Sequence, residues 1–243
     1  MKLSIRNKLF VGICIPIAVI YLVVLSVEYR IRSNAAILSM EAYLKELTES
    51  EAAEIDAKLA SVAQVCRTSA GILSCCQLDD AEKIIRILRT SILGNSDIYG
   101  MATAYEPGII FKDRRLFSPY FCRDTGTGDL MFVDTGLKDF NYTSQNWYAL
   151  AKAKGEPVWT EPYYDDEFGK TFMCTYSAPI FRDGVFAGVS AADVSLSRLS
   201  DDVDEMKAAG GYCTMVSRSG RVISHPVKSY IMHETIFSLA EKN

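Results

Sequence analysis

Histidine is scarce in this sequence: His225 and His233 are the only two among 243 residues. No Cys-x-x-Cys pair occurs either, so nothing supports a zinc site built from cysteine and histidine. A hydrolase needs a nucleophile paired with a base, or a metal cluster, and neither pattern is present. The sequence therefore predicts a protein that is not an enzyme, with no catalytic residues, no cofactor and no metal.

An excess of basic residues is also lacking. Lysine and arginine number 26 against 30 aspartates and glutamates, which gives a net charge of −4. Because no cluster of Lys and Arg provides an electrostatic footprint, a nucleic-acid partner is excluded. Hydrophobic content of 49% and charged content of 23% are typical of a folded globular protein.

Cysteine, in contrast, is present in an odd number, seven. Cys14 lies in an apolar run, and spacing alone does not assign partners among the other six. A bond between the adjacent Cys75 and Cys76 would be strained. The sequence favours buried or opportunistically paired thiols and leaves any disulfide pairing open.

The longest apolar run, Leu9–Val27, has no charge over its 19 positions. That length is close to the roughly 20 residues that a helix needs to cross a bilayer. Positive charge is concentrated before the run, at Lys2, Arg6 and Lys8, and is weaker after it, at Glu28, Arg30 and Arg32. We therefore expect a cytoplasmic segment 1–8, a transmembrane helix 9–27 and an exported domain. A cleaved signal peptide is the alternative, but the run is too long and no small-x-small site follows it.

A long helix is predicted next, over residues 28–75, because the chain has no proline or glycine there until Gly71. Apolar and small residues recur along it at spacings of three and four: Ile55, Leu59, Val62, Cys66, Ser69 and Leu73. This stripe offers a seam to a second copy, and we expect a homodimer through the stalk helix. The alternative is that the helix packs only on its own domain.

The rest of the chain predicts an α+β domain. A helix over Ala81–Leu93 is capped by Asp79 and Asp80 and ends at Gly94, and another over Gln145–Lys154 begins at Ser144 and ends at Gly155. Short β-like runs surround the second helix, at Ile98–Tyr105, Leu116–Cys122, Leu130–Val133, Thr171–Phe181 and Val185–Val194. A tight turn at Arg182-Asp183-Gly184 joins the last two.

The C-terminal part predicts a helix over Ser195–Met206 and a second hairpin over residues 212–224 with its turn at Arg218-Ser219-Gly220. A turn at His225-Pro226 and a short helix from Glu234 follow. Because two strands do not bury a core alone, this piece reads as the beginning of a second domain.

The segment Asn146–Leu196, with its words W-T-E-P-Y and T-Y-S-x-P, resembles the double Cache family of extracytoplasmic sensor domains. Related modules head bacterial serine phosphatases, histidine kinases and chemoreceptors. The resemblance implies a PAS-like antiparallel sheet with flanking helices in a membrane-distal subdomain, residues 76–196. A linker helix and an incomplete membrane-proximal subdomain, residues 197–243, would follow, and no output domain is recognised.

The same resemblance implies a ligand site in the distal subdomain, formed by Trp147, Tyr148, Tyr163, Asp165 and Asp193. Two carboxylates accept charge-assisted hydrogen bonds from an ammonium group, and aromatic faces add cation–π attraction. These aromatic residues are equally consistent with an ordinary core.

Two departures from the family pattern change the expected ligand. Gln145 stands where amino-acid binders carry an arginine that grips the ligand carboxylate, and Phe140 stands where a tyrosine is expected. Tyr142 and Tyr105 are candidate replacements for that hydroxyl. Without a guanidinium fork, an α-carboxylate loses its strongest partner. We therefore expect a small amine or another polar metabolite.

Asp193 is the most informative of these residues because it lies in an otherwise apolar strand, where an unpaired carboxylate is costly. Its alternative role is a cap on the helix that begins near Ser195. The sequence as a whole favours the small-molecule input module of a membrane receptor. A truncated remnant or a structural anchored domain without a ligand is the alternative, followed by an anchored hydrolase.

Overall fold

The computed structural model describes residues 9–75, 80–111, 116–137, 140–204 and 211–241. The chain divides into two compact units, Met1–Ala52 and Ala53–Asn243. In the first unit, the π-helix η1 (Phe10–Cys14) leads into α2 (Ile15–Cys75), which continues into the second unit. The apolar side chains of the N-terminal segment of α2 are exposed. Among the described residues, Phe10–Cys75 is the one helical stretch apolar and long enough to be a candidate membrane span. Residues 1–8 lie outside the described ranges, so the predicted membrane topology stays a prediction.

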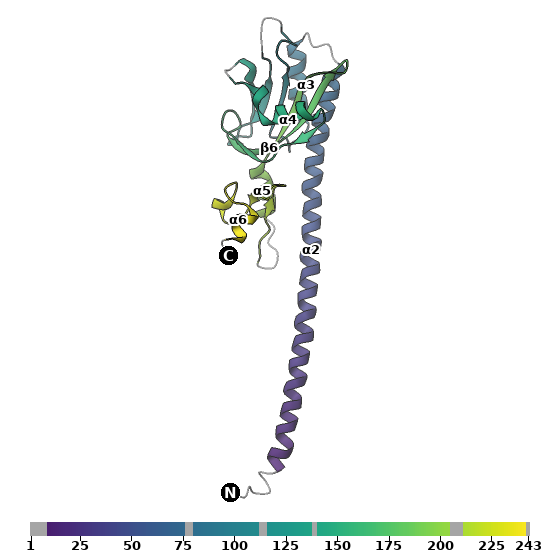
Figure 1. Cartoon of the computed structure of the whole chain (residues 1–243), viewed down its shortest axis with the longest axis vertical. Coiled ribbons are helices and arrows are strands. Elements are labelled where there is room, and N and C mark those ends of the chain that lie inside the picture. The colour runs from purple at the N-terminus through teal and green to yellow at the C-terminus, as the bar shows by residue number, and fades with distance from the viewer. Residues whose placement is uncertain (1–8, 76–79, 112–115, 138–139, 205–210, 242–243) are drawn as a thin grey trace. The chain divides into compact units, whose positions relative to one another are not determined.

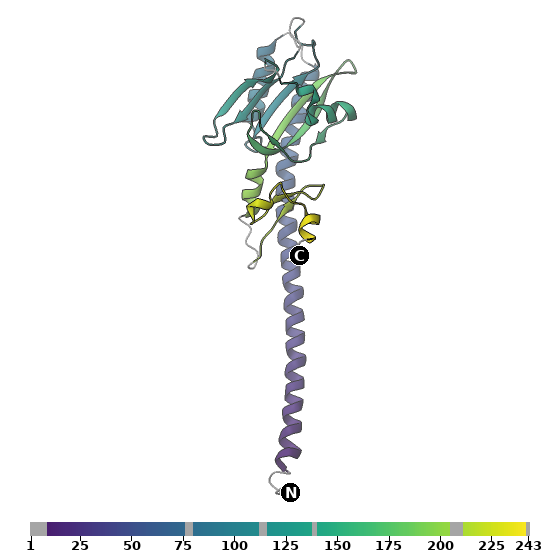
Figure 2. The same cartoon turned by 60° about the vertical axis from the view of Figure 1, so that its left-hand side comes forward.

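The second unit is organised around an antiparallel sheet in the order β3-β2-β1-β7-β6-β4, with β5 paired to β6 (Figures 1 and 2). Its strands are β1 (Gly100–Tyr105), β2 (Pro119–Arg123), β3 (Leu130–Asp134), β4 (Val158–Trp159), β5 (Tyr163–Asp165), β6 (Thr171–Arg182) and β7 (Val185–Ser195). The five predicted β-like runs correspond to β1, β2, β3, β6 and β7. β4 and β5 were not predicted, because strands of two and three residues are too short to show a period.

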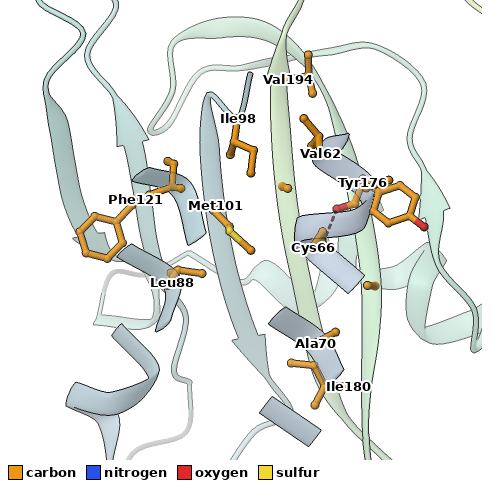
Figure 3. Close-up of a cluster of buried hydrophobic side chains, with 14 of the residues drawn as sticks. Val62, Cys66, Ala70, Leu88, Ile98, Met101, Phe121, Tyr176, Ile180 and Val194 are labelled. Atoms are coloured by element: carbon orange, nitrogen blue, oxygen red, sulfur yellow. Dashed lines mark hydrogen bonds between the residues drawn. The ribbon is translucent and has the colours of Figure 1, made fainter. Parts of the chain in front are cut away.

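One face of the sheet packs against α2 and α3 (Ala81–Leu93). The α2 residues Val62, Cys66 and Leu73 are fully buried there, and Figure 3 shows Val62 and Cys66 on the helix segment that crosses the strands carrying Tyr176 and Val194. This part of the predicted stripe therefore packs on its own domain. The homodimer through the stalk helix stays a prediction.

The α3 helix has the predicted bounds. Asp80 caps it by accepting a hydrogen bond from the Lys83 amide at 3.1 Å, and Gly94 is its C-cap. The other predicted cap, Asp79, lies outside the described residues.

The opposite face of the sheet is covered by short 3₁₀ turns, η2 (Thr135–Leu137) and η3 (Tyr142–Ser144), and by α4 (Asn146–Lys154). Gly155 ends α4 with a left-handed φ of 66°, as predicted. The predicted Ser144 cap is wrong: Gln145 is the N-cap residue, and the Ser144 hydroxyl donates to the Asn141 carbonyl at 2.9 Å. Because Ser144 is part of the η3 turn, its hydroxyl bonds within that turn and does not cap the amides of α4.

The hairpin of β6 and β7 turns at Asp183 and Gly184, whose φ angles are 50° and 78°. This confirms the predicted tight turn. A bulge follows in the ladder between Ile180 and Phe181, which shifts the register of every pair beyond it.

After the sheet come α5 (Leu196–Asp204), a two-stranded sheet of β8 (Met215–Val216) and β9 (Val222–Ser224), η4 (Lys228–Tyr230) and α6 (Ile236–Ala240). The predicted helix to Met206 is described only to Asp204. α6 is capped by Thr235 and starts two residues after the predicted Glu234. The long N-terminal helix, antiparallel sheet and flanking helices together confirm the predicted α+β, PAS-like fold class.

Candidate ligand-binding site

A cavity of about 480 Å³ lies on the α4 face of the sheet. Its floor is built from small residues on adjacent strands, since Ala102 of β1 pairs with Ala191 of β7. In the next row, Gly100 pairs with Asp193, and a Cβ at Gly100 would lie 2.7 Å from Asp193 Oδ2. The small side chains of Ala102 and Ala191 leave space above the sheet for a ligand, and the absence of a side chain at Gly100 makes room for Asp193 and the Tyr120 ring.

Two segments of chain form most of the cavity walls. The η3–α4 segment contributes Asn141, Ser144, Gln145 and Trp147, and the β5 turn contributes residues 163–168. Aromatic rings link the walls to the floor: Phe168 packs edge-on against Phe140, with centroids 5.0 Å apart, and against Tyr120 at 6.2 Å.

Asp193 is the polar centre of the cavity floor, and the residue is 6% exposed. The Tyr120 hydroxyl donates to Oδ2 at 3.0 Å, and the Thr175 hydroxyl donates to Oδ1 at 2.7 Å. Because Thr175 uses its proton on Asp193, the Tyr163 hydroxyl, 2.7 Å from Thr175 Oγ1, must donate to Thr175. Both carboxylate oxygens therefore accept hydrogen bonds from neutral hydroxyls within the sheet. They do not cap α5, which was the alternative role predicted for Asp193.

Burial raises the pKa of Asp193 to about 7, although the hydrogen bonds from Thr175 and Tyr120 oppose the rise. The neighbouring carboxylate of Asp165 adds to it. Burial and the charge of Asp193 likewise raise the pKa of the Tyr120 hydroxyl well above its usual range. A cation near Asp193 would lower the pKa of this carboxyl group by stabilising its ionised form.

Asp165 plays a different part. Its Oδ2 accepts from the Gly169 amide at 2.8 Å, and its Oδ1 accepts from the Glu167 amide at 3.2 Å. These bonds hold the β5–β6 turn against the cavity, so Asp165 shapes the wall as well as carrying charge.

The charge of the lining is one-sided. Its acidic members are Asp165, Asp166, Glu167 and Asp193, and the described lining residues include no lysine, arginine or histidine. Such a cavity has a negative potential and favours a cationic group.

Five of the eight residues predicted for the site line this cavity, namely Gln145, Trp147, Tyr163, Asp165 and Asp193. Tyr105, Tyr142 and Tyr148 do not line it, and all three are fully buried. Tyr105 lies on the strand face toward α2 and α3, stacked with Phe117. The Tyr142 hydroxyl donates to the Tyr105 carbonyl at 2.7 Å, and the Tyr148 hydroxyl donates to Glu106 at 2.6 Å. These phenols thus hold the core together beside the cavity.

Three residues that sequence reasoning missed are Tyr120, Thr175 and Ser118. Tyr120 lines the cavity from β2, Ser118 lines it from the segment just before that strand, and Thr175 is the direct cross-strand partner of Asp193. A short β-like run predicts β2 as a strand, but only the sheet order shows which of its faces meets Asp193.

Known proteins match this chain by sequence and by fold. Residues 84–201 match the family described as "Methyl-accepting chemotaxis protein-like, first PDC sensor domain". Methyl-accepting chemotaxis protein PscA of Pseudomonas syringae pv. tomato is 30% identical over 95 residues, which are 39% of this chain and 15% of PscA. The match thus spans a small part of that relative's length.

Two solved sensor domains have similar folds. The extracellular domain of mmHK1S-Z3, a protein predicted to be a histidine kinase, is 27% identical with a TM-score of 0.66, over 76% of this chain and 70% of that one. The ligand-binding domain of the Pseudomonas aeruginosa PAO1 chemoreceptor PctC, solved in complex with GABA, has a TM-score of 0.63 at 21% identity, over 84% of this chain and 81% of that one.

Proposed function

We propose that the chain is the input module of a membrane-bound receptor, because residues 84–201 match the PDC sensor-domain family and the fold resembles that of a solved extracellular sensor domain. In this proposal the distal subdomain, residues 76–196, binds a small cationic amine in the cavity above Asp193. The module binds its ligand without transforming it.

One observation carries the choice of an amine. Asp193 is a buried carboxylate whose protein partners are neutral hydroxyls, in a cavity lined by acidic residues. A buried charge without a counter-ion is costly, and an ammonium group would supply that counter-ion from the ligand. Trp147 and Tyr163 offer aromatic surface for the same cation.

Gln145 supports a ligand without an essential carboxylate. It lies in the cavity wall at the start of α4 and carries no charge. An amide hydrogen-bonds a carboxylate but does not neutralise it, so an α-amino acid would gain less here than at a guanidinium.

Hydrogen bonds connect the ligand-binding strands to α2 and so support a signalling role. The Cys66 thiol of α2 donates to the Ser190 carbonyl of β7 at 3.1 Å and to the Tyr176 carbonyl of β6 at 3.4 Å (Figure 3). Arg67 donates to the Tyr176 hydroxyl at 2.6 Å. Asp193 and Thr175 lie on those same two strands, so a ligand that prefers one strand arrangement would bias the helix.

For the whole chain we propose a single-pass protein of the cell membrane, with a cytoplasmic N-terminus, an extracytoplasmic domain and a homodimer formed through the stalk helix. The apolar, exposed N-terminal part of the helix supports the membrane anchor. A monomer at high protein concentration in light scattering would contradict the homodimer.

The test of the amine proposal is calorimetric titration of the full chain in lipid nanodiscs with propylamine, butylamine, pentylamine and hexylamine, each compared with the alcohol of equal length. We expect the amines to bind and the alcohols not to bind. The Asp193→Asn variant should bind the amines about 10- to 100-fold more weakly, because it replaces charge-assisted hydrogen bonds by neutral ones.

Asp166→Asn is the matched control, because Asp166 lies in the lining but its side chain is exposed. We expect a smaller loss there, since exposed charges are screened by solvent. Equal binding of alcohols and amines, or no effect of Asp193→Asn, would contradict the proposed function. A folded chain that binds none of these compounds would favour the alternative of a domain without a ligand.

A further inference from the structure

Ser118 is a buried polar residue that the amine site does not use. It is 1% exposed, it lines the cavity, and its hydroxyl oxygen has no hydrogen-bond partner among the described residues. An unpaired buried hydroxyl costs free energy. Because this hydroxyl lies at the cavity, its position indicates that a polar group of a bound ligand forms the missing hydrogen bond.

The surroundings of Ser118 are polar and uncharged. Besides its tyrosines and Trp147, the lining has four more neutral hydrogen-bonding side chains: Thr135, Asn141, Ser144 and Gln145. Thr135 is tied to Ser118 directly, since its hydroxyl and its amide both bond the Ser118 carbonyl at 2.9 Å. These two bonds hold the backbone of Ser118 in place, and the Ser118 hydroxyl remains available to a ligand in the cavity.

One charged residue, Asp134, bonds the backbone of Ser118. Asp134, which is not part of the lining, accepts from the Ser118 amide at 3.4 Å and from the Gly136 amide at 3.0 Å. Its negative charge disfavours a ligand carboxylate at this end of the cavity. Its Oδ1 is engaged by these two backbone amides and the residue lies outside the lining, so a ligand ammonium in the cavity would gain little from it.

The sheet register sets the distance between Ser118 and Asp193. Asp193 pairs with Gly100, and Ala102 pairs with Tyr120, so Ser118 lies two strands and four residues away from Asp193. Strand spacings place their Cα atoms roughly 16 Å apart. After a hydrogen bond at each end, a bridging ligand has roughly 10 Å to span.

We propose that Ser118 and its neutral neighbours form a second subsite that recognises an uncharged hydroxyl or amide at the far end of the ligand. This inference rests on the proposed amine site at Asp193 and narrows its ligand class. The ligand is then an elongated amino alcohol or amino amide, with its ammonium at Asp193 and its neutral polar group at Ser118. A diamine or an amino acid suits this cavity less well.

A matched series tests the inference, because its members differ only in the far end. The probes are hexylamine, 6-aminohexan-1-ol, 1,6-diaminohexane and 6-aminohexanoate, titrated against the full chain in nanodiscs. We expect 6-aminohexan-1-ol to bind about fivefold more tightly than hexylamine, as one added neutral hydrogen bond allows. The diamine and the amino acid should bind more weakly than the amino alcohol.

The Ser118→Ala variant should remove that preference and leave hexylamine binding unchanged. Ser200→Ala is the matched control, because Ser200 is another buried hydroxyl without a partner among the described residues and lies outside the cavity lining. Neither substitution removes a hydrogen bond that the serine hydroxyl makes to a described residue, so we expect both variants to fold. Their melting temperatures check this expectation.

Two kinds of failure are distinguishable. Equal binding of hexylamine and 6-aminohexan-1-ol, tightest binding of the diamine or amino acid, or a preference that survives Ser118→Ala would overturn the second subsite and leave the amine site standing. Absence of binding by all four amines would overturn the amine site, and the second subsite with it.

Discussion

At the scale of single residues, Asp193 combines two opposing demands. Its carboxylate is buried beside neutral hydroxyls, which weakens the folded state whenever the group is ionised. The same burial leaves its charge available to a ligand. Such a residue lowers stability where it serves binding, as functional sites commonly do.

The stability of the protein should therefore fall as pH rises through the weakly acidic range. Asp193 has a pKa of about 7 in the folded chain against an ordinary 3.8. Between these values the unfolded chain has lost the proton that the folded chain keeps, so the free energy of unfolding decreases with pH and then levels off. The contribution is fully present below pH ~4 and lost above pH ~7.

Asp193→Asn removes this titration, and we expect it to stabilise the ligand-free protein at pH 8 by roughly 2–4 kcal/mol while changing little at pH 4. Denaturant unfolding at several pH values measures the difference. Asp166→Asn, at an exposed lining position, serves as the control. Parallel stability profiles for the wild type and Asp193→Asn would contradict the ionisation argument.

Sequence reasoning selected Asp193 as a candidate from the family resemblance and because a carboxylate in an apolar strand needs a partner wherever it lies. It did not separate Trp147 and Tyr163, which line the cavity, from Tyr105, Tyr142 and Tyr148, which do not. All five are aromatic residues in similar local patterns, and their difference arises from strand faces and from the η3 turn. Composition does not encode those features.

At the scale of elements, the register of the β6–β7 hairpin determines which residue is the cross-strand partner of Asp193. Counted from its turn, where Arg182 pairs with Val185, an unbroken ladder would place Cys174 opposite Asp193. The bulge between Ile180 and Phe181 moves the register by one residue, so that Thr175 faces Asp193 instead. Tight turns are readable from sequence, but a bulge is not, and a shift of one residue exchanges the faces of a strand.

Gly188 lies at this bulge and touches the neighbouring strand. It pairs with Ile180 on β6 and with Tyr105 on β1, and a Cβ there would lie 2.9 Å from the Tyr105 Cα and still closer to the Ala104 carbonyl oxygen. Those atoms are backbone and have little freedom to move. Gly188→Ala should therefore lower the free energy of unfolding by about 1–3 kcal/mol.

Gly71→Ala is a suitable comparison because Gly71 is exposed in α2 and an added Cβ meets no atom within 4 Å. There alanine should stabilise the protein by about 0.5–1 kcal/mol, through helix propensity. Thermal unfolding of both variants measures the contrast. A Gly188→Ala protein as stable as the wild type would show that the sheet tolerates closer spacing than the structure indicates.

At the scale of the whole molecule, the long helix α2 belongs to two environments. Its segment from Val62 to Leu73 is part of the domain core, whereas the side chains of its apolar N-terminal segment are exposed. A 3.6-residue period marks the first segment and an uncharged run marks the second, so both were predictable from sequence. The side of the membrane on which the domain lies was predicted only from the balance of charges around the run.

That orientation is testable through Cys75, an exposed thiol at the end of α2. In a variant that retains Cys75 as its single cysteine, a membrane-impermeant maleimide should label intact bacterial cells, because the exported domain places this thiol outside the membrane. A second variant with Lys2→Cys as its single cysteine should be labelled only after the cells are permeabilised. The reverse pattern would place the domain in the cytoplasm, where a receptor for external amines has no access to its ligand. Labelling of both thiols in intact cells would instead contradict an uncleaved membrane-spanning anchor.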